Sequence, residues 1–228
     1  MSLIPKPIER GFEASLRPVV EWLIAREVNP NALTTVGTLV LVGSAVAYGT
    51  GVARLGGALL LLSGVFDMLD GRVARGRLAA SEFGAFYDST LDRVGESALF
   101  TGIALFFVAG GVPAWIVTPA VGVAVAALAF SLIVSYARAR AEGLGLECKV
   151  GIAQRAERIL GLGVPTLFFG AGPDGLLLLG IVTLLALVAL VTVVQRVVHV
   201  HRNTKPVRRV TQIRRAPAAV AEVDWKGK

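Results

Sequence analysis

This sequence has little cysteine and few charged residues for its length. Its 228 residues include one cysteine, Cys148, and only 17% are Asp, Glu, Lys or Arg. One thiol cannot form a disulfide framework or a zinc site. The low charge, combined with 54% hydrophobic residues and a mean hydropathy of +0.69, excludes an ordinary soluble domain of this length. We therefore expect an all-α, polytopic membrane protein.

Charge is absent altogether from two long stretches, residues 97–137 and 175–195. The first is long enough for two membrane spans, joined by the turn signal Gly110-Gly111-Val112-Pro113. The hydropathy pattern predicts six transmembrane helices, at about residues 32–52, 55–75, 83–109, 114–141, 154–171 and 175–200. An amphipathic segment precedes them and a basic segment follows. The expected organisation is an interfacial amphipathic helix in residues 1–28, a six-span domain in residues 29–201 and a disordered basic tail in residues 202–228.

The orientation in the membrane follows from the basic residues. With a cytoplasmic N-terminus, Arg54 is the only one of 23 Lys and Arg residues on the outer side. Both termini and the acidic residues of the second and third spans then lie at the cytoplasmic face. The N-terminal segment is charged and lacks the features of a signal peptide. The net charge of +7 is explained by basic flanks that face anionic lipid, so no nucleic acid partner is expected. Asn31 is the expected N-cap of the first span.

Four aspartates interrupt the apolar pattern. Asp67 and Asp70 are three residues apart and Asp88 and Asp92 four apart, so each pair lies on one face of a helix. An ionised carboxylate at membrane depth costs at least about 2.5–3.5 kcal/mol on insertion scales, and four of them require a cationic partner. Oxygen ligands that also receive substrate phosphates suit Mg2+ or Mn2+.

Small residues and an arginine accompany the aspartates. Gly71 and Gly84 allow a bulky ligand to approach the backbone, and Arg75 offers a planar fork to phosphate oxygens. Two alternatives are buried ion pairs with neighbouring arginines and a divalent-cation transporter. Neither alternative has a use for the glycines, and a transporter would hold its carboxylates nearer the bilayer midplane.

The complete motif resembles the signature of the CDP-alcohol phosphotransferase family. It consists of Asp67, Asp70-Gly71, Ala74-Arg75, Gly84, Asp88 and Asp92. In that family a CDP-activated lipid gives its phosphatidyl group to a small alcohol, and CMP is released. The resemblance implies that Asp67, Asp70, Asp88 and Asp92 bind metal and that Asp92 is also the candidate base. It further implies that Gly71, Ala74, Arg75 and Gly84 surround the cytidine diphosphate, and that the protein is a homodimer.

A second polar cluster lies at the cytoplasmic ends of the last three predicted spans. Arg138, Arg158 and Arg196 resemble the basic residues with which bacterial phosphatidylinositol phosphate synthases hold the phosphate of their acceptor. The residue at the position of Arg138 is commonly lysine in those enzymes and is arginine in this chain. Arg155 is explained equally well as a basic flank. Glu96, one turn after Asp92, suits either support of the site or an ion pair with a neighbouring arginine.

The expected reaction is transfer of a phosphatidyl group from CDP-diacylglycerol to a phosphorylated polyol, with inositol 1-phosphate as the favoured acceptor and the bilayer as the environment. Glycerol 3-phosphate is the alternative acceptor, followed by unphosphorylated inositol or serine. An archaeal ether lipid as donor is equally compatible with the sequence.

Overall fold

The structure is a computed structural model that describes residues 6–77, 81–152 and 155–204, with side chains from residue 15 onward. Within these residues the chain is helical and contains no strand, which confirms the all-α prediction. The helices are α1 Lys6–Ala25, α2 Pro30–Gly49, α3 Ala53–Gly76, α4 Glu82–Phe106, α5 Val117–Glu142, α6 Arg155–Phe169 and α7 Leu176–Asn203. Two short helical turns, η1 Phe107–Gly111 and η2 Ala114–Ile116, lie between α4 and α5, and a third, η3 Pro173–Gly175, lies between α6 and α7. The predicted tail lies almost entirely outside the described residues.

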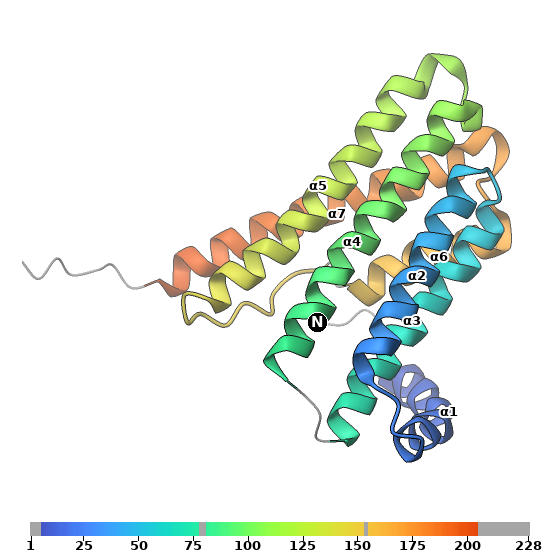
Figure 1. Cartoon of the computed structure of the whole chain (residues 1–228). Coiled ribbons are helices and arrows are strands. Elements are labelled where there is room, and N and C mark those ends of the chain that lie inside the picture. The colour runs from blue at the N-terminus through green and yellow to red at the C-terminus, as the bar shows by residue number, and fades with distance from the viewer. Residues whose placement is uncertain (1–5, 78–80, 153–154, 205–228) are drawn as a thin grey trace, which may run out of the picture.

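Helices α2 to α7 form a bundle in which helices that are not consecutive in the chain also pack against each other (Figure 1). Helix α2 packs against α3 and α4, α5 packs against α4 and α7, and α3 packs against α6. The bounds of these helices follow the six predicted segments to within a few residues. The start of α2 differs from the prediction. Its N-cap is Asn29, whose side chain accepts a hydrogen bond from the backbone N–H of Asn31 at 2.9 Å, because Pro30 takes the first helical position.

Close backbone contacts hold α2 and α4 together in the core. A Cβ atom added to Gly102 on α4 would fall on the backbone carbonyl of Ala45 on α2. Around this contact lie buried side chains from several helices, among them Tyr48, Leu60, Ile103 and Phe107. Gly102 therefore lets α2 and α4 approach each other closely.

Four segments are long and apolar enough to cross a membrane, by length and composition. They are Pro30–Gly49, Glu82–Gly111, Ala114–Gly143 and Pro173–Asn203. Large apolar side chains are exposed along these segments, for example Leu39, Leu105, Leu184 and Val194. Exposed apolar side chains along segments of this length are typical of a surface that faces lipid, so the protein is an integral membrane protein. Helices α3 and α6 do not meet the same criteria: α6 has 15 residues, and α3 carries charged residues along its second half.

Helix α1 lies across the end of the bundle where α3 finishes (Figure 1). Its residues Leu23 and Ile24 belong to a small apolar cluster with Leu69 and Val73 of α3. Arg77 closes this contact, since its Nη1 atom donates to the carbonyl oxygens of residues 27 and 28 at 2.7 and 2.8 Å. The aspartate-bearing end of α3 therefore has α1 packed beside it. The location of α1 at a membrane interface stays a prediction.

Candidate metal and phosphate site

Three of the four predicted aspartates meet at one point. Oxygen atoms of Asp67, Asp70 and Asp88 lie within 4.8 Å of one another, with two carboxylates supplied by α3 and one by α4. Asp70 is buried and the other two are partly buried. The Oδ1 atom of Asp88 is buried and has no hydrogen-bond partner in the described part of the chain. An oxygen cluster with such an unsatisfied atom fits a hard divalent cation.

Thr34 on α2 supports this cluster. Its hydroxyl donates to Oδ2 of Asp70 at 2.7 Å, and both residues are more than nine-tenths buried. The same hydroxyl lies 3.2 Å from the carbonyl of Pro30, but it has one proton, and the carboxylate is nearer and charged. The hydroxyl therefore orients Asp70. Nothing in the sequence distinguished Thr34, because its partner is 36 residues away.

The predicted donor-binding residues line one cavity of about 180 Å³. It lies between the start of α2, the second half of α3 and the first turns of α4, with Asp70 and Asp88 at one side. All four predicted residues contribute, namely Gly71, Ala74, Arg75 and Gly84. The first turn of α4 is capped by Ser81, which accepts a hydrogen bond from the N–H of Gly84 at 3.0 Å. A helix N-terminus favours negative charge, so this cavity suits a phosphate-bearing ligand.

Both glycines matter for the shape of the cavity. A Cβ atom at Gly71 would lie 3.5 Å from Nη1 of Arg75, so the guanidinium lies directly over that glycine. A Cβ at Gly84 would lie 3.1 Å from Oγ of Ser81 and 3.4 Å from Oδ1 of Asn31. A side chain at either position would take space from a ligand in the cavity.

The fourth aspartate, Asp92, has a different environment from the other three. Its carboxylate makes an ion pair with Nη1 of Arg155 on α6 and a second one, at 3.4 Å, with Nη2 of Arg93. Arg155 also reaches Oδ1 of Asp67 at 3.5 Å with its Nη2 atom. Asp92 and Arg155 line a small cavity together with Asp67 and Asp70. Arg155, for which the sequence left two interpretations open, thus lies within the acidic site.

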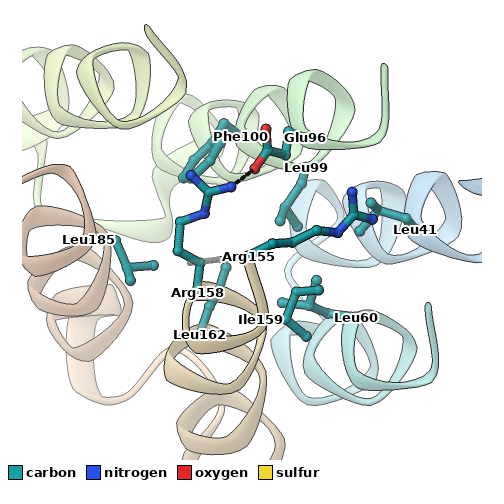
Figure 2. Close-up of a pocket in the computed structure, with 10 residues that line it drawn as sticks. All are labelled: Leu41, Leu60, Glu96, Leu99, Phe100, Arg155, Arg158, Ile159, Leu162 and Leu185. Carbon is teal, nitrogen blue, oxygen red and sulfur yellow. Dashed lines mark hydrogen bonds and ion pairs between the residues drawn. The ribbon is translucent and has the colours of Figure 1, made fainter. Parts of the chain in front are cut away.

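Arg158 lies one turn further along α6 and points in another direction (Figure 2). Its Nη2 atom is paired with Oε1 of Glu96, and both residues are buried. The other carboxylate oxygen of Glu96, Oε2, lies 3.3 Å from Nε of Arg93. The Nη1 atom of Arg158 is buried and makes no hydrogen bond within the described residues. This donor is oriented by Glu96 and is available to an anionic ligand.

The other two predicted phosphate-binding residues come from α5 and α7. Arg196 is buried and donates from Nε to the carbonyl of Val150 at 3.0 Å and from Nη1 to that of Val134. Arg138 is exposed, and its Nε atom lies 2.8 Å from Glu142 on the same helix. Arg138 and Arg158 both lie near enough to Arg196 to act on it electrostatically. The structure thus brings the three arginines into one region, although each has protein partners. Their role as a phosphate pocket stays a prediction.

Comparison with known proteins points to one family. The model of the family described as CDP-alcohol phosphatidyltransferase matches residues 27–195. A phosphatidylinositol phosphate synthase of Cutibacterium acnes is 41% identical over 152 residues, which are 66% of this chain and 71% of that protein. An archaetidylinositol phosphate synthase of Methanothermobacter thermautotrophicus is 41% identical over 150 residues, 65% of this chain and 72% of the relative.

Solved structures agree with the sequence comparison. The phosphatidylinositol phosphate synthase of Mycobacterium tuberculosis with CDP-DAG bound matches with a TM-score of 0.69 at 31% identity, over 80% of this chain and 92% of that one. The same enzyme in complex with manganese and citrate matches with a TM-score of 0.70, over 81% and 88% of the two chains. That protein thus binds the CDP-lipid and a divalent metal on a similar fold.

Proposed function

Because this chain belongs to the CDP-alcohol phosphatidyltransferase family, we propose that it transfers the phosphatidyl group of CDP-diacylglycerol to inositol 1-phosphate and releases CMP. One observation carries the proposal: the acidic cluster of Asp67, Asp70 and Asp88 borders the cavity with the donor-binding motif on one side and the start of α6, at Arg155, on the other. A donor phosphate and an acceptor phosphate can therefore be held on opposite sides of the same carboxylates.

The donor is bound in the cavity between α2, α3 and α4. The N-terminus of α4 faces the pyrophosphate, and Arg75 supplies a positive charge above Gly71. Asp67, Asp70 and Asp88 hold Mg2+ or Mn2+, with Asp92 as a further ligand or as the base. When bound, the cation neutralises charge on the phosphate oxygens and on the leaving CMP. The three carboxylates would thus hold the cation beside the donor phosphates.

The acceptor approaches from the side of α6. Arg158, Arg196 and Arg138 attract its phosphate group, and Arg158 offers the buried Nη1 donor. The acceptor hydroxyl oxygen attacks the phosphorus of the phosphatidyl group, and the bond from that phosphorus to the CMP oxygen breaks. Asp92 takes the hydroxyl proton. Its pair with Arg93 helps to orient the carboxylate.

The lipid donor has one specific alternative. Two relatives are archaetidylinositol phosphate synthases, from Methanothermobacter thermautotrophicus and Pyrococcus horikoshii. An archaetidyl CDP-lipid is therefore the second candidate donor, with the same acceptor. Glycerol 3-phosphate is retained as the alternative acceptor because the three arginines recognise only its phosphate.

We also propose that all six helices α2 to α7 cross the membrane, with α1 at the interface and both termini and the site in the cytoplasm. The distribution of basic residues supports this orientation, since Arg54 lies at the far end of α3 from the aspartates. In this arrangement residues 1–28, 29–201 and 202–228 are the interfacial helix, the enzyme domain and the tail. A homodimer is part of the same proposal and rests on family resemblance.

CMP release by the purified enzyme with Mg2+ tests the function. The assay offers CDP-diacylglycerol or its archaetidyl counterpart as donor, and inositol 1-phosphate, glycerol 3-phosphate, inositol or serine as acceptor. We expect inositol 1-phosphate to give the highest kcat/KM. A preference for glycerol 3-phosphate or for free inositol would refute the proposed acceptor.

A further inference from the structure

Arg155 has contacts that the transfer reaction does not explain. It begins α6, and its guanidinium reaches the carboxylates of Asp67 on α3 and Asp92 on α4. It also acts electrostatically on Asp88. A single side chain thus contacts or influences most of the acidic site. Its own exposed fraction is 23%, so these ion pairs are only partly screened by water.

A divalent cation and this guanidinium require the same carboxylate oxygens. Asp67 belongs to the group of oxygens that lie within 4.8 Å of one another, and Nη2 of Arg155 lies 3.5 Å from one oxygen of this carboxylate. A carboxylate that binds a hard cation directly loses most of its attraction for a neighbouring arginine, and the two positive charges repel each other. Binding of one cation therefore opposes binding of the other.

Arg155 also borders a second, small cavity of about 30 Å³. It lines the cavity that contains Asp67, Asp70 and Asp92, and it also lines the neighbouring cavity that contains Arg158 and Glu96. Figure 2 shows the two arginines leaving the same side of α6 toward different helices. A rotation about its long side chain would turn the guanidinium from the carboxylates toward Arg158, where an anion would have to balance the added charge.

We propose that Arg155 is a displaceable internal cation: it holds Asp67 and Asp92 until a divalent metal takes their oxygens, and its released guanidinium then binds a substrate phosphate. The inference rests on the metal site of the proposed function. By linkage, a phosphate-like anion that holds Arg155 away from the carboxylates raises the affinity for metal, and metal raises the affinity for the anion by the same factor.

Mn2+ binding to the purified protein, measured by electron paramagnetic resonance without donor or acceptor, tests the first step. If the guanidinium holds the carboxylates for about nine-tenths of the time, Arg155→Gln binds Mn2+ about tenfold more tightly than the wild type. Arg155→Lys keeps the charge but loses the planar fork, so its affinity falls between the two.

Two matched controls separate competition from simple loss of positive charge. Arg93→Gln removes a cation that lies 3.4 Å from Asp92 but does not reach Asp67, and we expect a gain of only about two- to threefold. Arg54→Gln removes the same charge at the far end of α3, about 20 Å from Asp67 by helix rise, and leaves the affinity unchanged. Equal gains in Arg155→Gln and Arg93→Gln, or no gain in Arg155→Gln, would overturn the proposal.

The second step is tested with sulfate, which resembles dianionic phosphate and binds Mn2+ weakly. Sulfate should tighten Mn2+ binding to the wild type by up to about tenfold and leave Arg155→Gln unaffected. A sulfate effect that persists in Arg155→Gln would refute the phosphate-binding step. Asp70→Asn should abolish Mn2+ binding. If the wild type binds no Mn2+, or if its binding does not depend on Asp70, the metal site of the proposed function fails as well. If Mn2+ binding depends on Asp70 but is unchanged in Arg155→Gln, the inference about Arg155 fails and the proposed metal site stands.

Discussion

Replacing Thr34 by valine tests whether the acidic cluster depends on support from α2. Valine keeps the branched shape of threonine but has no hydroxyl. In the wild type this hydroxyl donates to Oδ2 of Asp70 at 2.7 Å, and the two residues are 8% and 6% exposed. Water cannot readily replace the lost donor at such a buried position. The variant therefore leaves one oxygen of Asp70 without its partner and the carboxylate free to rotate.

The size of the effect follows from the type of hydrogen bond. A hydrogen bond to a charged group contributes about 1.5–3 kcal/mol, and residues that orient metal ligands typically change metal affinity or activity by about 10- to 100-fold. We expect Thr34→Val to weaken Mn2+ binding within that range. Without metal, the free energy of unfolding should also fall, by about 1–3 kcal/mol, because a buried carboxylate has lost a donor.

Mn2+ titration of the purified variant, followed by CMP release at saturating metal, measures both consequences. Thr183→Val is the matched control, because the hydroxyl of Thr183 donates to the carbonyl of Leu179 on its own helix, at 2.7 Å, and contacts no carboxylate among the described residues. This control should keep the wild-type metal affinity. If Thr34→Val also binds Mn2+ within about twofold of the wild type, the hydroxyl does not orient Asp70, and the acidic cluster does not depend on α2 for its geometry.

Three further predictions concern the carboxylates and the arginines. Asp88→Asn should abolish CMP release while the protein still inserts and folds, and EDTA should do the same to the wild type; activity in EDTA would contradict a metal mechanism. Asp92→Asn should lower kcat much more than it weakens CDP-lipid binding if this carboxylate takes the proton, whereas equal losses would make it only a ligand. Arg196→Ala should raise the KM for inositol 1-phosphate about tenfold or more with little change in the KM for the CDP-lipid, and an unchanged acceptor KM would remove Arg196 from the phosphate pocket.

The part of the site that depends on local spacing was predictable from the sequence. Asp67 and Asp70 share a face of α3 because they are three residues apart, and α3 continues through them to residue 76. The donor cavity follows for the same reason, since its glycines and Arg75 belong to the same two helical segments as the aspartates. Helical periodicity is enough to place such residues together once α3 and α4 pack on α2.

The contacts between helices that are distant in the chain were not predictable in this way. Asp92 is one turn beyond Asp88, and periodicity alone groups the two. In the structure Asp92 is paired with Arg155, because the start of α6 lies opposite that turn of α4. Thr34 and Glu96 acquire their roles likewise, from partners 36 and 62 residues away. No local pattern carries information about which helix lies opposite.

Two of the bundle helices α2 to α7, namely α3 and α6, lie outside the four apolar segments of membrane-spanning length, and both contribute charged residues to the site. Helix α3 contributes Asp67 and Asp70, and α6 contributes Arg155 and Arg158. Their charges contact each other or α4 in the interior of the bundle, as the pairs of Arg155 with Asp67 and of Arg158 with Glu96 show. A hydropathy average counts these side chains as if each were exposed to lipid, although paired interior charges are the arrangement that membrane enzymes tolerate. The charges that lower the hydropathy of α3 are therefore a consequence of the site, whereas α6 falls short through its length of 15 residues.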